Sequence, residues 1–167
     1  DIGTRLFLQH IPTLQPTPDS PNQQTIVDLG CGNGIVGIIA AERNPAAQIQ
    51  FIDESYMALD SARINFEAAF GDSRSASYRA ANCLEAAEAN SADLILNNPP
   101  FHQQQAVGDH IAKQMFKQSR TVLRSGGELW VIGNRHLGYH KQLKRLFGNC
   151  ELVASNAKFV VLKALKR

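Results

Sequence analysis

The sequence predicts an α/β fold in which helices cover both faces of a mainly parallel sheet. Short apolar runs alternate with longer segments of helical periodicity, which is typical of parallel strands joined by crossover helices. A glycine-rich stretch at residues 30–34 directly follows the first strong apolar run. Only a two-residue turn, Asn156-Ala157, separates the last two apolar runs. These two runs are therefore expected to pair as an antiparallel hairpin.

Local signals define the elements of the first half. We expect a helix at 3–11, a proline-rich loop at 12–24, a strand at 25–29, a helix at 35–43, a strand at 48–52 and a helix ending near Phe70. Pro45 cannot extend the second helix. Ser55 is expected to cap the third, because a serine oxygen accepts a hydrogen bond from a free N–H of the first turn. Met57 is expected to pack in the core of that helix.

The second half supplies the remaining strands. We expect a weak strand at 77–81, an uncertain helical turn near Glu85, a strand at 92–97, a helix from about 109 to 124, a strand at 128–133, a helix at 138–147 and strands at 151–155 and 158–165. Pro99 and Pro100 end the strand before them, because proline cannot donate to the ladder. Glycine pairs or Gly-Asn end the two helices. Seven strands result.

Composition restricts the class of protein. The 167 residues suit one domain, and no apolar run is long enough to span a membrane. Cys31, Cys83 and Cys150 lack the spacing of a zinc site or a disulfide scaffold, so a reducing, cytoplasmic location is expected. The chain begins with Asp1 rather than Met, which indicates one domain, residues 1–167, of a longer protein.

Charge is divided unevenly along the chain. Residues 1–109 carry 5 Lys or Arg against 13 Asp or Glu, a net charge of −8. Residues 110–167 carry 12 against 2, a net charge of +10. Helical spacing places four cations on one stripe and three on the next helix: Lys113, Lys117, Arg120 and Arg124, then Lys141, Lys144 and Arg145. These cations form either a solvated face or a surface for a polyanion such as RNA.

The glycine loop and the acidic residue that follows it indicate a ligand site. Without a Cβ, Gly30, Gly32 and Gly34 allow a ligand to approach the backbone closely. Asp53 lies 23 residues after Gly30, at the end of the next strand, where a carboxylate can accept hydrogen bonds from both hydroxyls of a ribose. Ile35 stands where a dinucleotide-binding fingerprint has its third glycine, which disfavours a dehydrogenase.

Several motifs together carry a resemblance to a known family. They are Asp1-Ile2-Gly3-Thr4-Arg5-Leu6, Val27-Asp28-Leu29-Gly30-Cys31-Gly32-Asn33-Gly34, Asn98-Pro99-Pro100-Phe101-His102 and Gly133-Asn134-Arg135-His136-Leu137. The chain resembles ribosomal RNA guanine-N2 methyltransferases over nearly its whole length. The resemblance implies the class I methyltransferase, Rossmann-like fold and the cofactor S-adenosyl-L-methionine. Family members have two domains, and the chain resembles the catalytic C-terminal half.

The resemblance also implies roles for individual residues. Cofactor-binding residues would be Asp28, Gly30, Gly32, Gly34, Asp53 and Asn82. Asp28 either reaches the methionine amino group indirectly or is tied to local backbone, and Asn82 either bonds the adenine amino group or is a turn residue. Catalytic residues would be Asn98, Pro99 and Phe101. The Asn98 side-chain oxygen and the Pro99 carbonyl would accept the N–H protons of guanine N2, and Phe101 would stack on the base. No metal is required.

The implied substrate is a guanine in ribosomal RNA, with 23S RNA of the large subunit expected and a monomeric enzyme acting on it. Alternatives within the same chemistry are guanine N2 of 16S RNA, adenine N6 or a glutamine amide. Glutamine-directed relatives usually have Tyr at the position of Phe101. An RNA-binding domain that kept the fold without catalysis is a further alternative, against which intact Asn98, Asp53 and the glycine loop argue.

Overall fold

The structure is a computed structural model that describes residues 2–18, 20, 23–100 and 105–167. Its helices are α1 (Ile2–His10), α2 (Ile35–Arg43), α3 (Tyr56–Phe70), α4 (Gln105–Val122) and α5 (Tyr139–Phe147). Its strands are β1 (Thr25–Leu29), β2 (Gln48–Asp53), β3 (Ala76–Ala80), β4 (Ala92–Asn97), β5 (Leu123–Asn134), β6 (Glu151–Ser155) and β7 (Phe159–Leu165). Two short 3-10 helices follow α3 and β5, at Gly71–Ser73 and Arg135–Leu137. In the described residues, no helix is both long enough and apolar enough to cross a bilayer.

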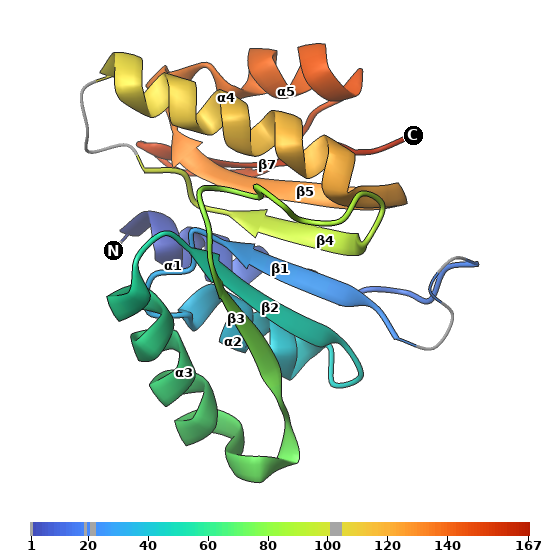
Figure 1. The fold of residues 1–167 in the computed structure, drawn as a ribbon. Helices are drawn as coiled ribbons and strands as arrows, with labels where there is room; N and C mark the ends of the chain where they lie inside the picture. The colour runs from blue at the N-terminus through green and yellow to red at the C-terminus, as the bar shows by residue number, and fades with distance from the viewer. Residues whose placement is uncertain (1, 19, 21–22, 101–104) are drawn as a thin grey trace.

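All seven strands form one sheet in the order β3-β2-β1-β4-β5-β7-β6. Strands β3, β2, β1, β4 and β5 are parallel, whereas β7 is antiparallel to both β5 and β6. The predicted seven-stranded, mainly parallel sheet with a C-terminal antiparallel hairpin is therefore confirmed (Figure 1). The strand order reverses between β1 and β4, and ligands of open α/β sheets bind at the carboxyl ends of such neighbours.

Helices cover both faces of the sheet, as predicted, and each face has its own core. On one face α1, α2 and α3 pack around Phe7, Phe51 and Phe66; on the other, α4 and α5 pack around Phe116 and Leu143 (Figure 1). Successive residues of β1 and β4 alternate between the two cores. Both strands are buried along their whole length, as expected for central strands of a parallel sheet.

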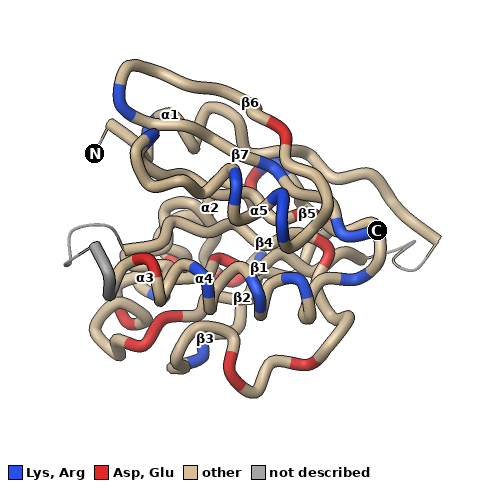
Figure 2. The backbone as a smooth tube through the Cα atoms, turned by 90° about the horizontal axis from the view of Figure 1, so that it is seen from above, with Lys and Arg blue, Asp and Glu red and all other residues tan. Residues whose placement is uncertain are grey.

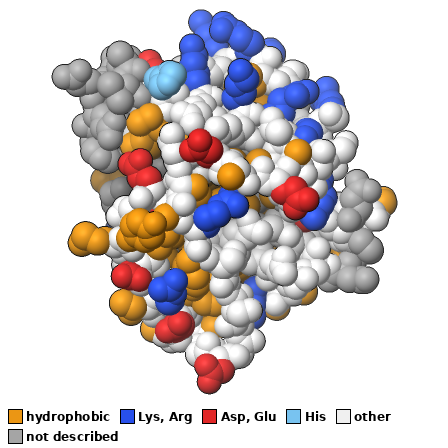
Figure 3. Space-filling view, viewed as in Figure 1, with side chains coloured by type: hydrophobic (Ala, Val, Ile, Leu, Met, Phe, Trp, Pro, Cys, Tyr) orange, Lys and Arg blue, Asp and Glu red, His pale blue; other side chains and the backbone are white. Residues whose placement is uncertain are grey.

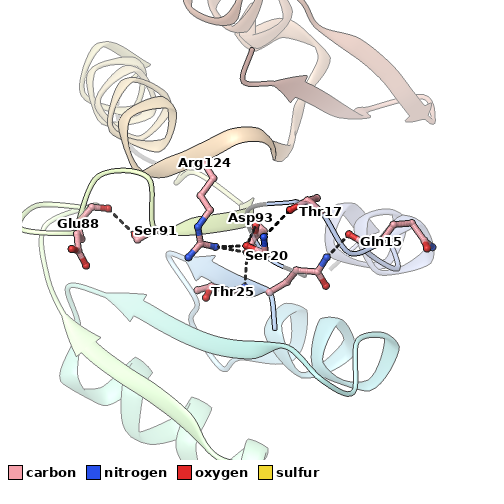
Figure 4. Close-up of polar contacts among 9 residues, drawn as sticks. Gln15, Thr17, Ser20, Thr25, Glu88, Ser91, Asp93 and Arg124 are labelled. Atoms are coloured by element: carbon pink, nitrogen blue, oxygen red, sulfur yellow. Dashed lines mark hydrogen bonds and ion pairs between the residues drawn. The ribbon is translucent and has the colours of Figure 1, made fainter. Parts of the chain in front are cut away.

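A partly buried ion pair fastens the loop before β1 to the edge of the sheet opposite those carboxyl ends. Asp93, near the start of β4, accepts hydrogen bonds from the Ser20 hydroxyl at 2.9 Å and the Thr25 backbone N at 2.8 Å (Figure 4). Its carboxylate lies 2.6 Å from the guanidinium of Arg124, which also donates to the Ser20 hydroxyl. This group of residues, the Asp93 clamp, joins three segments that are distant in sequence.

The structure corrects four expectations. Arg124 lies in β5 rather than on α4, because α4 ends at Val122 and the strand continues through Gly126 and Gly127, whose backbone groups pair with Lys166. The segment 81–91 forms turns without a helix near Glu85. Helix α4 begins before Asp109, at Gln105. Met57 is not in a core: its side chain is 84% exposed on the outer side of α3.

Candidate functional site

A cavity of about 320 Å³ opens at the carboxyl ends of β1, β2 and β4. Its volume is at the lower end of the range for small-molecule pockets. Its lining residues are Leu29, Gly30, Gly32, Ile52, Asp53, Glu54, Ala81, Asn82, Cys83, Asn98, Pro100, Ile111 and Met115. Five predicted site residues are thus brought together around one cavity: Gly30, Gly32, Asp53, Asn82 and Asn98.

A second depression is larger but lies elsewhere. It measures about 790 Å³, is wide open to solvent and runs between α1, the start of α2 and α3. Its lining includes Arg5, Leu8, Ile35 and Asn65, and none of the predicted site residues. The larger volume does not make this depression the ligand site. The smaller cavity lies where the strand order reverses, and ligands of open α/β sheets bind at that place.

The glycine loop presents its backbone to the cavity. Gly30 and Gly32 have positive φ angles of 71° and 52°, which glycine adopts without strain. The loop is anchored at its base, because the backbone N–H groups of Gly30 and Cys31 both donate to the carbonyl of Ile52, at 2.8 and 3.1 Å. A Cβ added at Gly32 would meet nothing within 4 Å, so this part of the loop borders open space.

Gly34 has a different position from the other two glycines. It caps α2 with a φ of 83°, and a Cβ there would lie 2.8 Å from the Cβ of Ala62 on α3. Gly34 does not line the cavity. Its contribution to the site is close packing of α2 against α3, which fixes where the loop enters the helix.

Asp53 is held by backbone donors on both carboxylate oxygens. Oδ2 accepts from the Gly32 backbone N at 3.0 Å, and Oδ1 accepts from the Ser55 backbone N at 2.9 Å. Ser55 caps α3 as predicted, since its hydroxyl accepts from the Ala58 backbone N. A carboxylate has about four acceptor positions, so Asp53 keeps capacity for hydroxyl groups of a ligand in the cavity.

Asp28 lies behind the loop rather than in the cavity lining. Its side chain is 3% exposed, and Oδ2 accepts from the Gly37 backbone N of α2 at 2.8 Å. Burial raises the pKa of Asp28 to about 7; the bond from Gly37 opposes this rise and the charge of Asp53 adds to it. Asp28 therefore joins β1 to α2 and does not line the cavity.

The Asn98-Pro99-Pro100 segment borders the cavity on the side opposite Asn82. Strand β4 ends at Asn97, immediately before the motif, as the two prolines predicted. Asn98 is half-buried and lines the cavity with Pro100, while Pro99 is buried beside them. The Cβ position of Gly30 lies 3.8 Å from the Asn98 carbonyl oxygen, so motif and glycine loop meet. Phe101 and His102 lie outside the described residues.

Asn97 is a site-forming residue that sequence reasoning missed. It is fully buried, and its Nδ2 donates to the Leu29 carbonyl at 3.3 Å and contacts the Met115 sulfur at 3.2 Å. Leu29 directly precedes the glycine loop, so Asn97 links that loop to the Asn98 motif. The sequence signal that could have identified Asn97 is a polar side chain directly after the apolar run Leu94-Ile95-Leu96.

The cavity lining contains both polar and apolar side chains. Asp53, Glu54, Asn82 and Asn98 supply hydrogen-bond acceptors, while Ile111 and Met115 of α4 supply apolar surface. Cys31 lies beside the loop without lining the cavity, and burial raises the pKa of its thiol far above its usual range, so it is not an activated nucleophile. The arrangement suits a polar ligand with hydroxyl and amino groups, held without covalent attachment.

Comparisons with known proteins agree with this geometry. The family model described as methyltransferase small domain matches residues 1–163. A ribosomal RNA large subunit methyltransferase G of Pseudomonas aeruginosa is 55% identical over 166 residues, and one of Vibrio vulnificus is 54% identical over 168 residues. Each match covers 99% of the chain, but the chain spans only 42% and 43% of these relatives.

Solved structures share the fold at low sequence identity. A 16S rRNA N2 methyltransferase of T. thermophilus, solved with AdoMet and guanosine, superposes with a TM-score of 0.76 at 22% identity, over 99% of this chain and 42% of that one. A precorrin-6y C5,15-methyltransferase of Geobacter metallireducens gives 0.70 at 15% identity, over 98% and 87%. The predicted class I methyltransferase fold is confirmed.

Proposed function

The chain belongs to the methyltransferase small domain family, and from that premise we propose that it transfers a methyl group from S-adenosyl-L-methionine to N2 of a guanine in ribosomal RNA. The observation that carries the proposal is the cavity in which the glycine loop, Asp53 and Asn98 meet. The names of the relatives support ribosomal RNA as the substrate, and the AdoMet and guanosine bound to the T. thermophilus neighbour support the cofactor and the base. We propose residues 1–167 as one catalytic domain.

The cavity residues fit the cofactor by their chemistry. The Asp53 carboxylate, with acceptor capacity left, suits the two ribose hydroxyls, and the open space at Gly32 suits close approach of the ligand to backbone. Asn82 would bond the adenine amino group, and Gly30 would border the methionine part. Asp28 and Gly34 would act through the loop and α2 that they hold. The bound cofactor supplies an electrophilic methyl group on its sulfonium.

For the chain's own residues, the chemical task is to aim a weak nucleophile. The lone pair of guanine N2 is delocalised into the ring, so two acceptors for its N–H protons are needed to direct it. We assign these to the Asn98 side-chain oxygen and the Pro99 backbone carbonyl. Ladder pairing of β4 on both sides and the Asn97 contacts hold this segment still, which is preorganisation without proton transfer. Stacking by Phe101 stays a prediction.

The names of the relatives refer to the large subunit and so support 23S RNA as the substrate. We further propose that the enzyme acts as a monomer in the cytoplasm. The 16S RNA named for the structural neighbour is the alternative, at much lower identity. Adenine N6 and glutamine amides remain chemically possible acceptors for an Asn-Pro-Pro motif.

The test is transfer of isotopically labelled methyl groups from S-adenosyl-L-methionine to purified 23S and 16S RNA. Nucleoside analysis should then find the label in N2-methylguanosine from 23S RNA, and an Asn98→Ala variant should lose most of this labelling. Label in N6-methyladenosine, or transfer by wild type only to protein, would contradict the assignment of guanine N2.

A further inference from the structure

Helices α4 and α5 present a continuous cationic surface, here called the basic face. It consists of Lys113, Lys117, Arg120, Lys141, Lys144 and Arg145. All six residues are exposed, while the opposite sides of the two helices are buried against the sheet. The helices touch each other, with Phe116 of α4 packed edge-on against Tyr139 of α5. Lys and Arg side chains gather over these helices at the top of the molecule (Figure 3).

The basic face is not neutralised within the part of the chain that the structure describes. The ion pairs found there join Arg63 to Asp60, Arg124 to Asp93, and Lys163 to Glu128 and Glu151. None of them involves the basic face. Helix α5 contains no acidic residue, and the acidic residue of α4, Asp109, lies in its N-terminal half (Figure 2). Asp109 stands four residues before Lys113 and offsets part of this charge, but six cations against one carboxylate still repel one another, which favours a polyanionic partner.

The structure changes which cations form this surface. Arg124, placed with Lys113, Lys117 and Arg120 by helical spacing, is committed to the Asp93 clamp in β5. The three cations of α5 take its place beside the α4 stripe, although they are distant in sequence.

The composition of the basic face selects the kind of polyanion contact. The described large apolar side chains that are exposed are Ile2, Ile35, Tyr56, Met57, Ile64 and Leu152, all outside α4 and α5. A helix lying on a lipid surface needs an exposed apolar side, so a membrane is disfavoured. The aromatic rings of the two helices, Phe116, Tyr139 and Phe147, are buried and unavailable for base stacking. The face therefore suits phosphates rather than bases.

The basic face adjoins the cavity through α4. Ile111 and Met115 of this helix line the cavity, while Lys113 and Lys117 project from its exposed side. The start of α4 lies against the motif, since the Cβ position of Gly108 is 3.4 Å from the Pro100 carbonyl oxygen. With a rise of about 1.5 Å per residue, Lys113 to Arg120 extends about 10 Å along the helix. Cations thus begin beside the motif and continue away from it.

We propose that the basic face binds the phosphate backbone of the RNA segment that flanks the target nucleotide, independently of base sequence. The inference rests on the proposed function and names the surface that positions its substrate. Phosphate contacts fix the register of a nucleic acid on a protein without reading sequence. The cavity would then receive the nucleotide turned out of the segment held on α4 and α5.

The test is the salt dependence of RNA binding, measured by fluorescence anisotropy with a labelled RNA hairpin whose loop contains guanines. Two variants each remove one cation from α4 and one from α5: Lys117→Gln with Lys144→Gln, and Lys113→Gln with Lys141→Gln. Glutamine keeps helix propensity. The control variant, Arg79→Gln with Lys158→Gln, removes two exposed cations from β3 and the β6–β7 turn.

Each face variant should flatten the slope of log K against log salt by about 1.4, because each phosphate contact to a single strand contributes about 0.7. The control should run parallel to wild type. Slopes equal to wild type in both face variants, or an equal flattening in the control, would overturn the proposal. Binding is measured without cofactor or turnover, so failure of methyl transfer would count against the proposed function and leave this result unaffected.

Discussion

The Oδ2 atom of Asp53 accepts a hydrogen bond of 3.0 Å from the backbone N of Gly32, so the carboxylate at the end of β2 orders the glycine loop that follows β1. Two motifs that are 21 residues apart in sequence therefore act as one structural unit. Any change at Asp53 alters both the acceptor in the cavity and the loop beside it.

Replacing Asp53 by Ala should weaken cofactor binding by at least tenfold, because each hydrogen bond to a charged group contributes roughly 1.5–3 kcal/mol and tenfold corresponds to about 1.4 kcal/mol. Isothermal titration calorimetry with S-adenosyl-L-methionine measures the loss. Asp72→Ala is the control, since it removes an exposed carboxylate that does not line the cavity, and its affinity should equal that of wild type. Equal affinities for wild type and Asp53→Ala would remove Asp53 from the cofactor site.

Replacing Asn98 by Ala should abolish most methyl transfer while cofactor affinity stays within about twofold, because the lost acceptor serves the reacting amine. Asn82→Ala should do the opposite, lowering cofactor affinity with a smaller effect on the turnover rate at saturating cofactor. Single-turnover transfer and calorimetry on both variants separate the two roles. Near wild-type turnover by Asn98→Ala would mean that the motif only ends β4.

Asp28 should make stability depend on pH. In the folded chain its pKa is about 7, against an ordinary value of 3.8, so the folded state holds a proton that the unfolded chain releases between these values. The contribution of Asp28 to the free energy of unfolding is therefore present at low pH and is lost as pH rises towards 7. The Asp28→Asn variant has no carboxyl group at this position, so its unfolding free energy does not fall with pH for this reason.

The difference in unfolding free energy between Asp28→Asn and wild type should accordingly rise by up to about 1.4 kcal/mol per pH unit from about pH 5 to 7, and then level off. Urea unfolding across that range measures it. Asp72→Asn changes an exposed carboxylate and serves as the control. A flat difference for Asp28→Asn would show that Asp28 is already ionised in the folded chain.

Breaking the Asp93 clamp should cost stability and leave cofactor binding unchanged in the folded protein. Asp93→Ala removes the acceptor of Ser20 and Thr25 and the partner of Arg124, which should cost about 1–3 kcal/mol, less than for a fully buried pair because the Arg124 side chain is 26% exposed. Asp60→Ala, which breaks the exposed pair with Arg63, should cost less than about 1 kcal/mol. Equal losses in the two variants would contradict the structural role of the clamp.

Sequence reasoning succeeded where the signal was local. Strand β1, helix α2 and the cap at Ser55 follow directly from apolar runs, glycine and proline positions and capping chemistry. The C-terminal hairpin followed from the absence of a helix between two strands. The meeting of Gly30, Gly32, Asp53, Asn82 and Asn98 at one cavity followed from the rule that parallel strands end at a common edge.

What the sequence did not predict depends on partners that are distant in the chain. Gly126 and Gly127 look like a turn, yet they continue β5 because Lys166 pairs with both of them. Arg124 is spaced from Arg120 as on a helix, yet it lies in β5, where its guanidinium binds Asp93. The role of Asn97 became visible only with Leu29 and Met115 beside it. For Met57, helical position alone did not show that this side of α3 is left exposed by the elements that the structure describes.

The position of β7 between β5 and β6 has a consequence for the order of folding during synthesis. Strand β6 leaves the ribosome first, yet its ladder partner is β7, so β6 has nothing to pair with until the later strand emerges. The growing chain meanwhile carries β5 as an open edge, the condition under which nascent chains associate wrongly. The edge of β5 therefore stays open, and β6 stays unpaired, until β7 has left the ribosome as well.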